Sequence, residues 1–283
     1  MLDALKTWLL SLMTSALNGF DIMLADASNI LKNGLGAWSS VAALSSVLKP
    51  FCLTIIAICL LVEIVQVFLK TDIMKWENGL KICIKMVLAK VCIDVAPKFL
   101  KACYAQAQEW VALLATGGST TGSTTVRYLE PLVKNVSGLG NILGMFLSTF
   151  VVILAIKICG LMVQVIAYGR MFELYVYLVV SPLPCAFLPL GDSGGGFSNS
   201  ITSKFFKNFI AVCLQGVMMV VVIRVFDVVM GTAISNALAD AAANPDANAA
   251  ITDLIYTMLL GAIALVMAIF KSGSWAKSIL DVM

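Results

Sequence analysis

The sequence of 283 residues contains no histidine and little charge. Without histidine, Ser-His-Asp and Cys-His catalysis are excluded, as are haem groups and zinc ions bound through histidine. Charged residues make up only 12% of the chain, about half their share in an ordinary soluble domain. The formal net charge is only +3, and the charge pattern argues against a dedicated nucleic-acid-binding surface.

Apolar residues dominate what is present. They make up 60% of the chain, and the mean hydropathy is +0.98. A water-soluble surface needs far more charge than this. The apolar residues run in long blocks, whereas a transmembrane β-barrel alternates apolar and polar residues. The composition therefore predicts an all-α, polytopic helical membrane protein with five to six transmembrane helices and amphipathic N-terminal helices.

The eight cysteines do not indicate a metal site or a disulfide framework. They include no C-x-x-C pair, and most of them lie inside apolar stretches. Free cysteine behaves as a small apolar residue. We therefore expect packing cysteines, and we predict no catalytic residue, no metal site and no cofactor.

Long uncharged stretches locate the membrane spans, because a bilayer core needs roughly 20 helical residues. Residues 1–35 are interrupted by charges and predict an interfacial amphipathic helix. Residues 72–113 carry nine charges between 72 and 101, which predicts an amphipathic helical hairpin or a long bent helix. Whether this segment crosses the membrane stays open, so the count is five or six. The predicted spans cover residues 48–69, 139–167, 174–190, 207–235 and 254–270.

Loop composition and basic residues suggest the organisation and orientation. The Gly/Ser/Thr-rich loop at 117–138 separates an N-terminal part, residues 1–116, from a C-terminal helical bundle, residues 139–283. Residues 237–250 form a predicted loop without Lys or Arg, so we expect it outside the cell. Lys271 and Lys277 then place the C-terminus in the cytoplasm.

Isolated charges within or near the spans are candidates for a polar lining or for helix pairing. Arg170 and Glu173 are three positions apart, as are Arg224 and Asp227, so each pair shares a helix face. The first pair is expected at a tight turn between the second and third spans. Both a conduit lining and a structural ion pair are open readings. The candidate intramembrane residues are Glu63, Lys157, Arg170, Glu173, Arg224 and Asp227. The candidate subunit or interface contacts are Lys81, Lys85, Lys90, Lys98 and Lys101.

One short motif is misleading. Residues 191–195 read GDSGG, as in the nucleophile segment of trypsin-like proteases. That chemistry needs a histidine to accept the serine proton, and the chain has none. We interpret the segment as a Gly-rich connector.

The C-terminal half carries a resemblance to a known family. Its segments read QVIAYGRMFELYVYLVVSPLPCAFLP and GDSGGGFSNSITSKFFKNFIAVCLQGVMMVVV. An amphipathic N-terminal segment, an early span and a charged amphipathic region precede them. In this order the segments resemble the TrbL-type polytopic membrane subunit of conjugative type IV secretion systems, which is related to the sixth VirB component. The resemblance is strongest over residues 139–235. The chain lacks the large central extracytoplasmic loop of some relatives.

The resemblance implies a non-enzymatic channel or scaffold subunit that contributes to DNA or protein translocation across the cytoplasmic membrane. It also implies a homo-oligomer in the lipid bilayer, in contact with secretion ATPases and a bitopic assembly-factor subunit. DNA or protein would be a transient substrate. The alternatives are a small-solute transporter or permease, and a membrane immunity or assembly factor.

Overall fold

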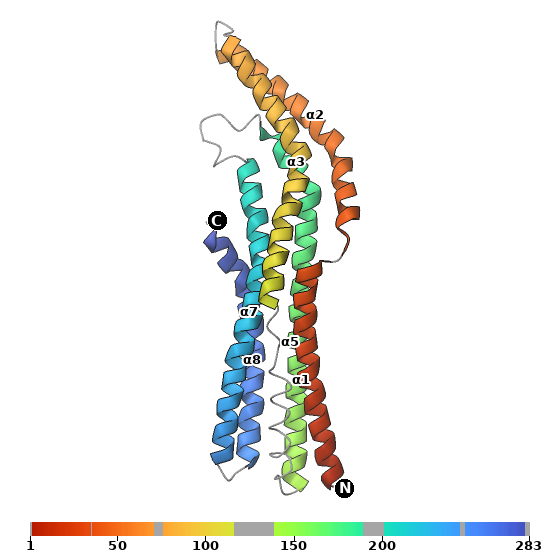
Figure 1. The fold of residues 1–283 in the computed structure, drawn as a ribbon, viewed down its shortest axis with the longest axis vertical. Coiled ribbons are helices and arrows are strands. Elements are labelled where there is room, and N and C mark those ends of the chain that lie inside the picture. Colours follow the sequence, from red (N-terminus) through yellow and green to blue (C-terminus); the bar gives the residue numbers. More distant parts are fainter. Residues whose placement is uncertain are drawn as a thin grey trace. The chain divides into compact units, whose positions relative to one another are not determined.

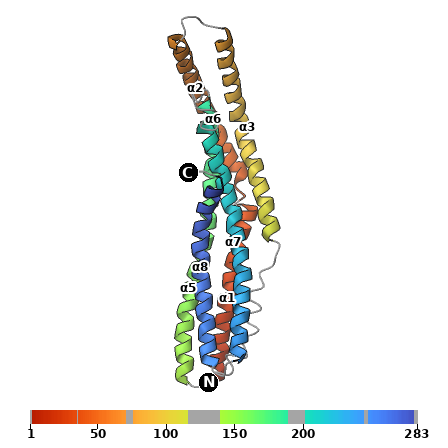
Figure 2. The same cartoon turned by 90° about the vertical axis from the view of Figure 1, so that its left-hand side faces the viewer.

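The structure is a computed structural model, and it describes residues 2–34, 36–70, 76–115, 139–188, 201–243 and 247–280. Within these ranges the regular elements are helices, and no strand is found there. Figures 1 and 2 together label them. The helices are α1 (Leu2–Asn33), α2 (Trp38–Lys70), α3 (Trp76–Ala115), α5 (Leu139–Val180), α6 (Pro182–Ala186), α7 (Ile201–Ala243) and α8 (Ala247–Ile279).

Within the described part of the chain, four helical segments are long and apolar enough to cross a membrane. The prediction of an all-α membrane protein is confirmed. The four segments are Trp38–Val65, Thr149–Ala186, Ile201–Asn236 and Tyr256–Ile279.

The predicted division between the second and third spans is wrong. Residues 139–180 form one continuous helix, α5, and the turn expected around Arg170 does not exist. The charges that interrupt this apolar block are an i, i+3 pair, Arg170 and Glu173, joined at 2.7 Å. Since a neutralised pair on one face does not disturb the backbone hydrogen bonds, the helix continues through it.

Residues 72–113 and 237–250 also differ from the expectations. Most of the first segment belongs to a single helix, α3, with Pro97 inside it, so the hairpin alternative is wrong. The second was expected to be a loop, but α7 extends to Ala243 and α8 begins at Ala247. Alanine is the strongest helix former, and this explains why an Ala-rich polar stretch is helical.

Several predictions concern residues outside the described part. The Gly/Ser/Thr-rich loop at 117–138 lies there, as does the GDSGG segment. The proposed organisation into residues 1–116, 117–138 and 139–283 stays a prediction. By its contacts the chain forms two compact units, and each draws on segments that are distant in sequence.

Unit 1 comprises Met1–Lys32, Trp110–Gly169 and Val217–Ser274. In it, α1 and α5 lie side by side and run in the same direction (Figure 1). The rings of Trp8 and Phe146 stack with centroids 4.8 Å apart, and Gln164 Nε2 donates to Asp26 Oδ2 at 3.5 Å. Both pairs are 138 positions apart, so the two helices keep one register over about five turns.

The other two long helices of unit 1, α7 and α8, run antiparallel (Figures 1 and 2). They approach closely where Gly261 of α8 faces Met230 of α7. A Cβ atom added to Gly261 would overlap the Met230 side chain. Small residues at such contacts let two helices in a membrane approach each other.

Unit 2 comprises Asn33–Glu109, Arg170–Gly216 and Trp275–Met283. Its core joins α2, α3 and α6 through side chains that are small for a core. These buried residues are Cys52, Ile56, Ala89, Ile93, Ala96, Cys185 and Ala186. The short side chains allow the helices to pack closely.

A glycine turn and an aromatic cluster fix the start of α2. Gly34 has φ +64°, a conformation that favours glycine. A Cβ atom on Gly34 would lie only 3.0 Å from the Tyr104 hydroxyl. Trp38 stacks on Tyr104 with ring centroids 4.8 Å apart. The Tyr104 hydroxyl donates to Met171 Sδ at 3.5 Å.

The end of α5 is set by proline chemistry. Pro182 has no backbone N–H, so it cannot donate the next helical hydrogen bond to the Leu178 carbonyl, and α5 ends at Val180. The short α6 then begins at Pro182. Thr202 at the start of α7 donates through Oγ1 to the Pro184 carbonyl at 2.8 Å. This bond ties the beginning of α7 to α6 in unit 2.

Candidate functional site

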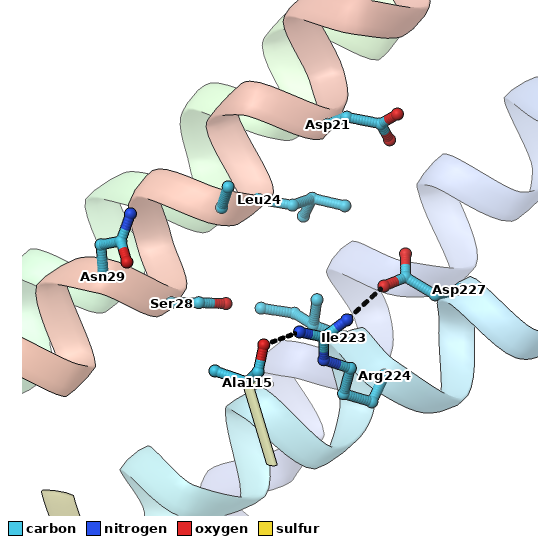
Figure 3. Close-up of a pocket in the computed structure, with 9 residues that line it drawn as sticks. Asp21, Leu24, Ser28, Asn29, Ala115, Ile223, Arg224 and Asp227 are labelled. Atoms are coloured by element: carbon cyan, nitrogen blue, oxygen red, sulfur yellow. Dashed lines mark hydrogen bonds and ion pairs between the residues drawn. The ribbon is translucent and has the colours of Figure 1, made fainter. Parts of the chain in front are cut away.

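Arg224 and Asp227 of α7 form the charged centre of a cavity in unit 1 (Figure 3). Arg224 Nη1 lies 3.5 Å from Asp227 Oδ2. The two side chains are 25% and 12% exposed. The two residues are one helical turn apart on α7, and they lie inside the apolar segment Ile201–Asn236. The sequence predicted this local pairing, and the structure contains it.

The same arginine also reaches the end of α3. Arg224 Nη2 donates to the carbonyl oxygen of Ala115, the last residue of that helix (Figure 3). The last four carbonyls of a helix have no partner within it, and they carry the negative end of the helix dipole. The guanidinium therefore neutralises Asp227 and caps α3 at the same time.

A cavity of about 240 Å³ opens beside this pair. One wall is a face of α1, whose lining residues recur every three or four positions, as they do on one side of a helix. The opposite wall is α7. The lining residues are Asp21, Leu24, Ala25, Ser28, Asn29, Ala115, Ile223, Arg224 and Asp227.

The cavity combines two carboxylates, one guanidinium, a hydroxyl and an amide. At roughly 30 Å³ for each water molecule in the liquid, its volume corresponds to about eight water molecules. Such a space accommodates water or a small polar solute. Among the described residues, no group of three or more Cys, Asp or Glu side chains is placed to hold a metal ion.

In unit 2, two ion pairs join α2 to α3. Lys85 Nζ lies 2.7 Å from Glu63 Oε1, with both side chains largely buried. Lys49 Nζ lies 3.1 Å from Asp94 Oδ1 in a more exposed position. The second oxygen of Glu63, Oε2, is buried and has no hydrogen-bond partner among the described residues. The partner of Glu63 is thus Lys85, which was predicted separately as an interface contact.

The remaining predicted residues do not gather at one place. Arg170 pairs with Glu173 in unit 2 and is not among the residues that line the cavity. Lys157 is exposed on α5, and its role stays a prediction. Lys90, Lys98 and Lys101 are exposed on α3. The side chain of Lys81 lies outside the described side chains.

Sequence reasoning missed three parts of these sites. Asp21 and Ala115 belong to the cavity, and Lys49 pairs with Asp94 from 45 positions away. Asp21 carried a weak signal. It shares a helix face with Leu24, Ala25 and Ser28, which lie three, four and seven positions after it. A backbone carbonyl such as that of Ala115 has no sequence signal.

Comparison with known proteins gives one family. The family described as TrbL/VirB6 plasmid conjugal transfer like protein matches residues 34–182, which is more than half of the chain. The match covers α2, α3, α5 and the intervening segment, whereas the sequence resemblance was judged strongest over residues 139–235. No curated protein and no solved structure matches the chain.

Proposed function

Because the chain belongs to the TrbL/VirB6 family of plasmid conjugal transfer like proteins, we propose that it is a channel or scaffold subunit of a conjugative type IV secretion system. The family and the four apolar helical segments make it a membrane component of conjugal transfer. The family match over residues 34–182 is the observation that carries the finer proposal. We assign the subunit no catalytic role.

A homo-oligomer is part of this proposal. Among the described residues, the cavity of unit 1 has a volume of about 240 Å³, whereas a nucleic-acid strand or a protein needs a wider passage. A ring of subunits supplies one. The exposed residues Lys90, Lys98 and Lys101 are candidates for contacts between subunits. The proposed partners are secretion ATPases and a bitopic assembly-factor subunit.

The sparse charge supports a passage that does not hold its substrate. Binding of DNA through phosphate contacts strengthens with each cation, and a strongly basic lining would trap a polyanion. Here most charges of the apolar helices are in pairs, such as Arg224 with Asp227 and Glu63 with Lys85. A weakly charged lining is compatible with release as well as entry.

Gene deletion in a donor cell tests the proposal. An in-frame deletion should abolish transfer of the mobile element to recipients, measured as transconjugants per donor. Expression of the intact chain from a second locus should restore transfer. Transfer at normal frequency from the deleted donor would reject the proposal.

Formaldehyde cross-linking separates a channel from a scaffold. If the subunit contributes to the passage, precipitating a tagged copy should recover the transferred strand of the element during mating. A donor that lacks the secretion ATPase is the matched control and should give no recovery. Loss of transfer on deletion, together with no recovered DNA, would favour a scaffold.

The orientation is a proposal from charge. Lys271 and Lys277 near the C-terminus favour a cytoplasmic end. A phosphatase fused after residue 283 should therefore be inactive, and a fluorescent protein fused there should be bright. The reverse pattern would place the C-terminus outside.

A further inference from the structure

The helix α3 falls outside the four apolar segments because of its charges, yet its packing ties it to one of them. Its neighbour α2 contains the segment Trp38–Val65, with a mean hydropathy of 2.3. Helix α2 and residues 76–109 of α3 belong to unit 2, and the two helices run in opposite directions. The later α2 residue, Glu63, pairs with the earlier α3 residue, Lys85, whereas Lys49 pairs with Asp94.

These two ion pairs fix the depth of α3. Lys49 and Glu63 both lie inside the apolar segment of α2. Residues 85–94 of α3 are therefore level with residues 49–63 of α2. Buried side chains between the pairs, Ile56 of α2 and Ile93 of α3, belong to the same core. Wherever this part of α2 crosses hydrocarbon, the adjoining part of α3 is in hydrocarbon too.

Each face of α3 has its own chemistry. On a wheel of 100° per residue, the buried residues Ala89, Ile93 and Ala96 point toward the core of unit 2. Lys90, Asp94 and Lys101 lie along one edge. The face away from the core is exposed and apolar over Leu80, Ile84, Val87, Val91 and Val95. Phe99 lies at the other edge of this face, where its half-exposed ring also packs edge-on against Phe206.

An outward apolar face is the reverse of what water favours. A helix at an aqueous surface places its charges on the face away from the core. On α3, Val87 is 63% exposed and Val91 is 51% exposed. Large contiguous apolar surfaces of this kind mark contact with another protein or with a membrane. The depth set by α2 favours the membrane.

The length of this face agrees with a bilayer. Residues 80–99 rise by about 30 Å at 1.5 Å per residue, which is the thickness of the hydrocarbon core. Two charges within this stretch, Lys85 and Asp94, are neutralised by α2. Lys90 lies on the charged edge with Asp94 and Lys101. Lys98 lies on the outward face near the end of this stretch, where its long side chain reaches toward the membrane interface.

We propose that α3 is a fifth membrane-crossing helix, and that its outward face (Leu80, Ile84, Val87, Val91, Val95 and Phe99) contacts the hydrocarbon chains of the lipid bilayer. Because of its charges, α3 does not meet a hydropathy criterion for a membrane span. Two of these charges, Lys85 and Asp94, are neutralised by ion pairs with α2. The proposal concerns the membrane topology of α3, and it does not depend on whether the subunit contributes to a passage for DNA or protein.

Cysteine accessibility tests the crossing. In a variant with all eight native cysteines replaced by alanine, single cysteines are placed at the start of α2, between α2 and α3, and after α3 by Ser39→Cys, Asp72→Cys and Ser119→Cys. A membrane-impermeant maleimide is applied to intact cells. We expect positions 39 and 119 to react alike, and position 72 to behave oppositely. Reaction of positions 72 and 119 from the same side would overturn the proposal.

Reporter fusions at residues 39, 72 and 119 of the chain with its native cysteines give a second measurement, in case the cysteine-free variant does not fold. Phosphatase activity should alternate with fluorescence of a fused fluorescent protein. Equal behaviour of the fusions at 72 and 119 would again overturn the crossing.

Nitroxide labels test the lipid contact directly. The labels are placed by Val87→Cys and Val91→Cys in protein reconstituted into phosphatidylcholine and phosphatidylglycerol vesicles. Each label should collide more with oxygen than with a water-soluble nickel chelate. Lys101→Cys, on the charged edge, is the matched control and should show the opposite preference. Greater access of the nickel chelate to positions 87 and 91, or no access of either reagent, would overturn the lipid contact.

Discussion

Several charges within the long helices are held in pairs over short distances. Arg170 pairs with Glu173 at 2.7 Å, and Arg224 lies 3.5 Å from Asp227. A single charge at the centre of a membrane helix costs a few kcal/mol, and an oppositely charged residue one turn away reduces that cost. Spacing alone predicts such pairs. Spacing cannot predict Lys49 with Asp94 or Arg224 with Ala115, which are 45 and 109 positions apart.

Replacing Arg224 tests the cavity of unit 1. Arg224→Met leaves the Asp227 carboxylate without its cation and the Ala115 carbonyl without its donor. Hydrogen bonds to charged groups are worth about 1.5 to 3 kcal/mol, so we expect the free energy of unfolding to fall by about 2 kcal/mol. Unfolding in mixed micelles measures it.

The control for this substitution is an exposed cation on another helix. Lys157→Met should change the free energy of unfolding by less than about 0.5 kcal/mol. Equal effects at Lys157 and Arg224 would contradict a structural role of the Arg224 contacts. The double variant with Asp227→Leu should lose less stability than the two single effects added together.

A thiol pair reports on the core of unit 2. Cys92 Sγ and Cys185 Sγ are 2.7 Å apart. Diamide takes two electrons and two protons from a pair of thiols and leaves one S–S bond. We expect it to join these two cysteines, which peptide mass mapping detects as a cross-linked pair. Cys185→Ser should abolish the cross-link, whereas Cys83→Ser should not. Alkylation of Cys92 and Cys185 as separate thiols after diamide treatment would disprove their contact.

At the scale of the element, helix continuity is the main difference from the sequence expectation. Searching for uncharged runs divides residues 139–190 into two spans, but the structure has α5 over Leu139–Val180 followed by α6. Helix type and approximate position were predictable, since apolar blocks specify both. The ends of the helices were not predictable. A helix continues through a charge that is paired with an opposite charge, as Arg170 is with Glu173.

The contact between α7 and α8 gives a prediction at this scale. Gly261→Leu introduces a side chain where even a Cβ atom would overlap Met230. Methionine is flexible and absorbs part of the strain, so we expect a loss of about 1 to 3 kcal/mol. Gly231→Leu is the matched control, because nothing lies within 4 Å of a Cβ atom there. Thermal unfolding that ranks Gly231→Leu as the more harmful change would contradict this packing.

At the scale of the whole molecule, the two compact units are built from interleaved segments. Unit 1 takes Met1–Lys32, Trp110–Gly169 and Val217–Ser274, and unit 2 takes the two stretches between these segments together with Trp275–Met283. The sequence suggested consecutive segments because its composition changes at the Gly/Ser/Thr-rich loop. Composition carries no information about which helices associate. Long-range contacts such as Gln164 with Asp26 decide that.

The exposed lysines of α3 give a prediction for the assembly. Replacing Lys90, Lys98 and Lys101 by glutamine removes three candidate subunit contacts. At roughly 0.5 kcal/mol for each exposed pair, association should weaken about tenfold. Chemical cross-linking in membranes measures the oligomer, and mating measures transfer. Replacing Lys157, Lys204 and Lys207 by glutamine is the control, and it should leave both unchanged. Normal cross-linking of the α3 variant would exclude these lysines from the interface.

The parallel register of α1 and α5 also affects how the chain is made. Trp8 and Asp26 meet residues that follow 138 positions later. At 5–20 residues per second, a ribosome takes roughly 7 to 28 s to synthesise that interval. During this time α1 has already left the ribosome, while its partner helix has not yet been translated. Helix α1 therefore lacks its α5 partner until α5 has been synthesised, and unit 1 cannot assemble before then.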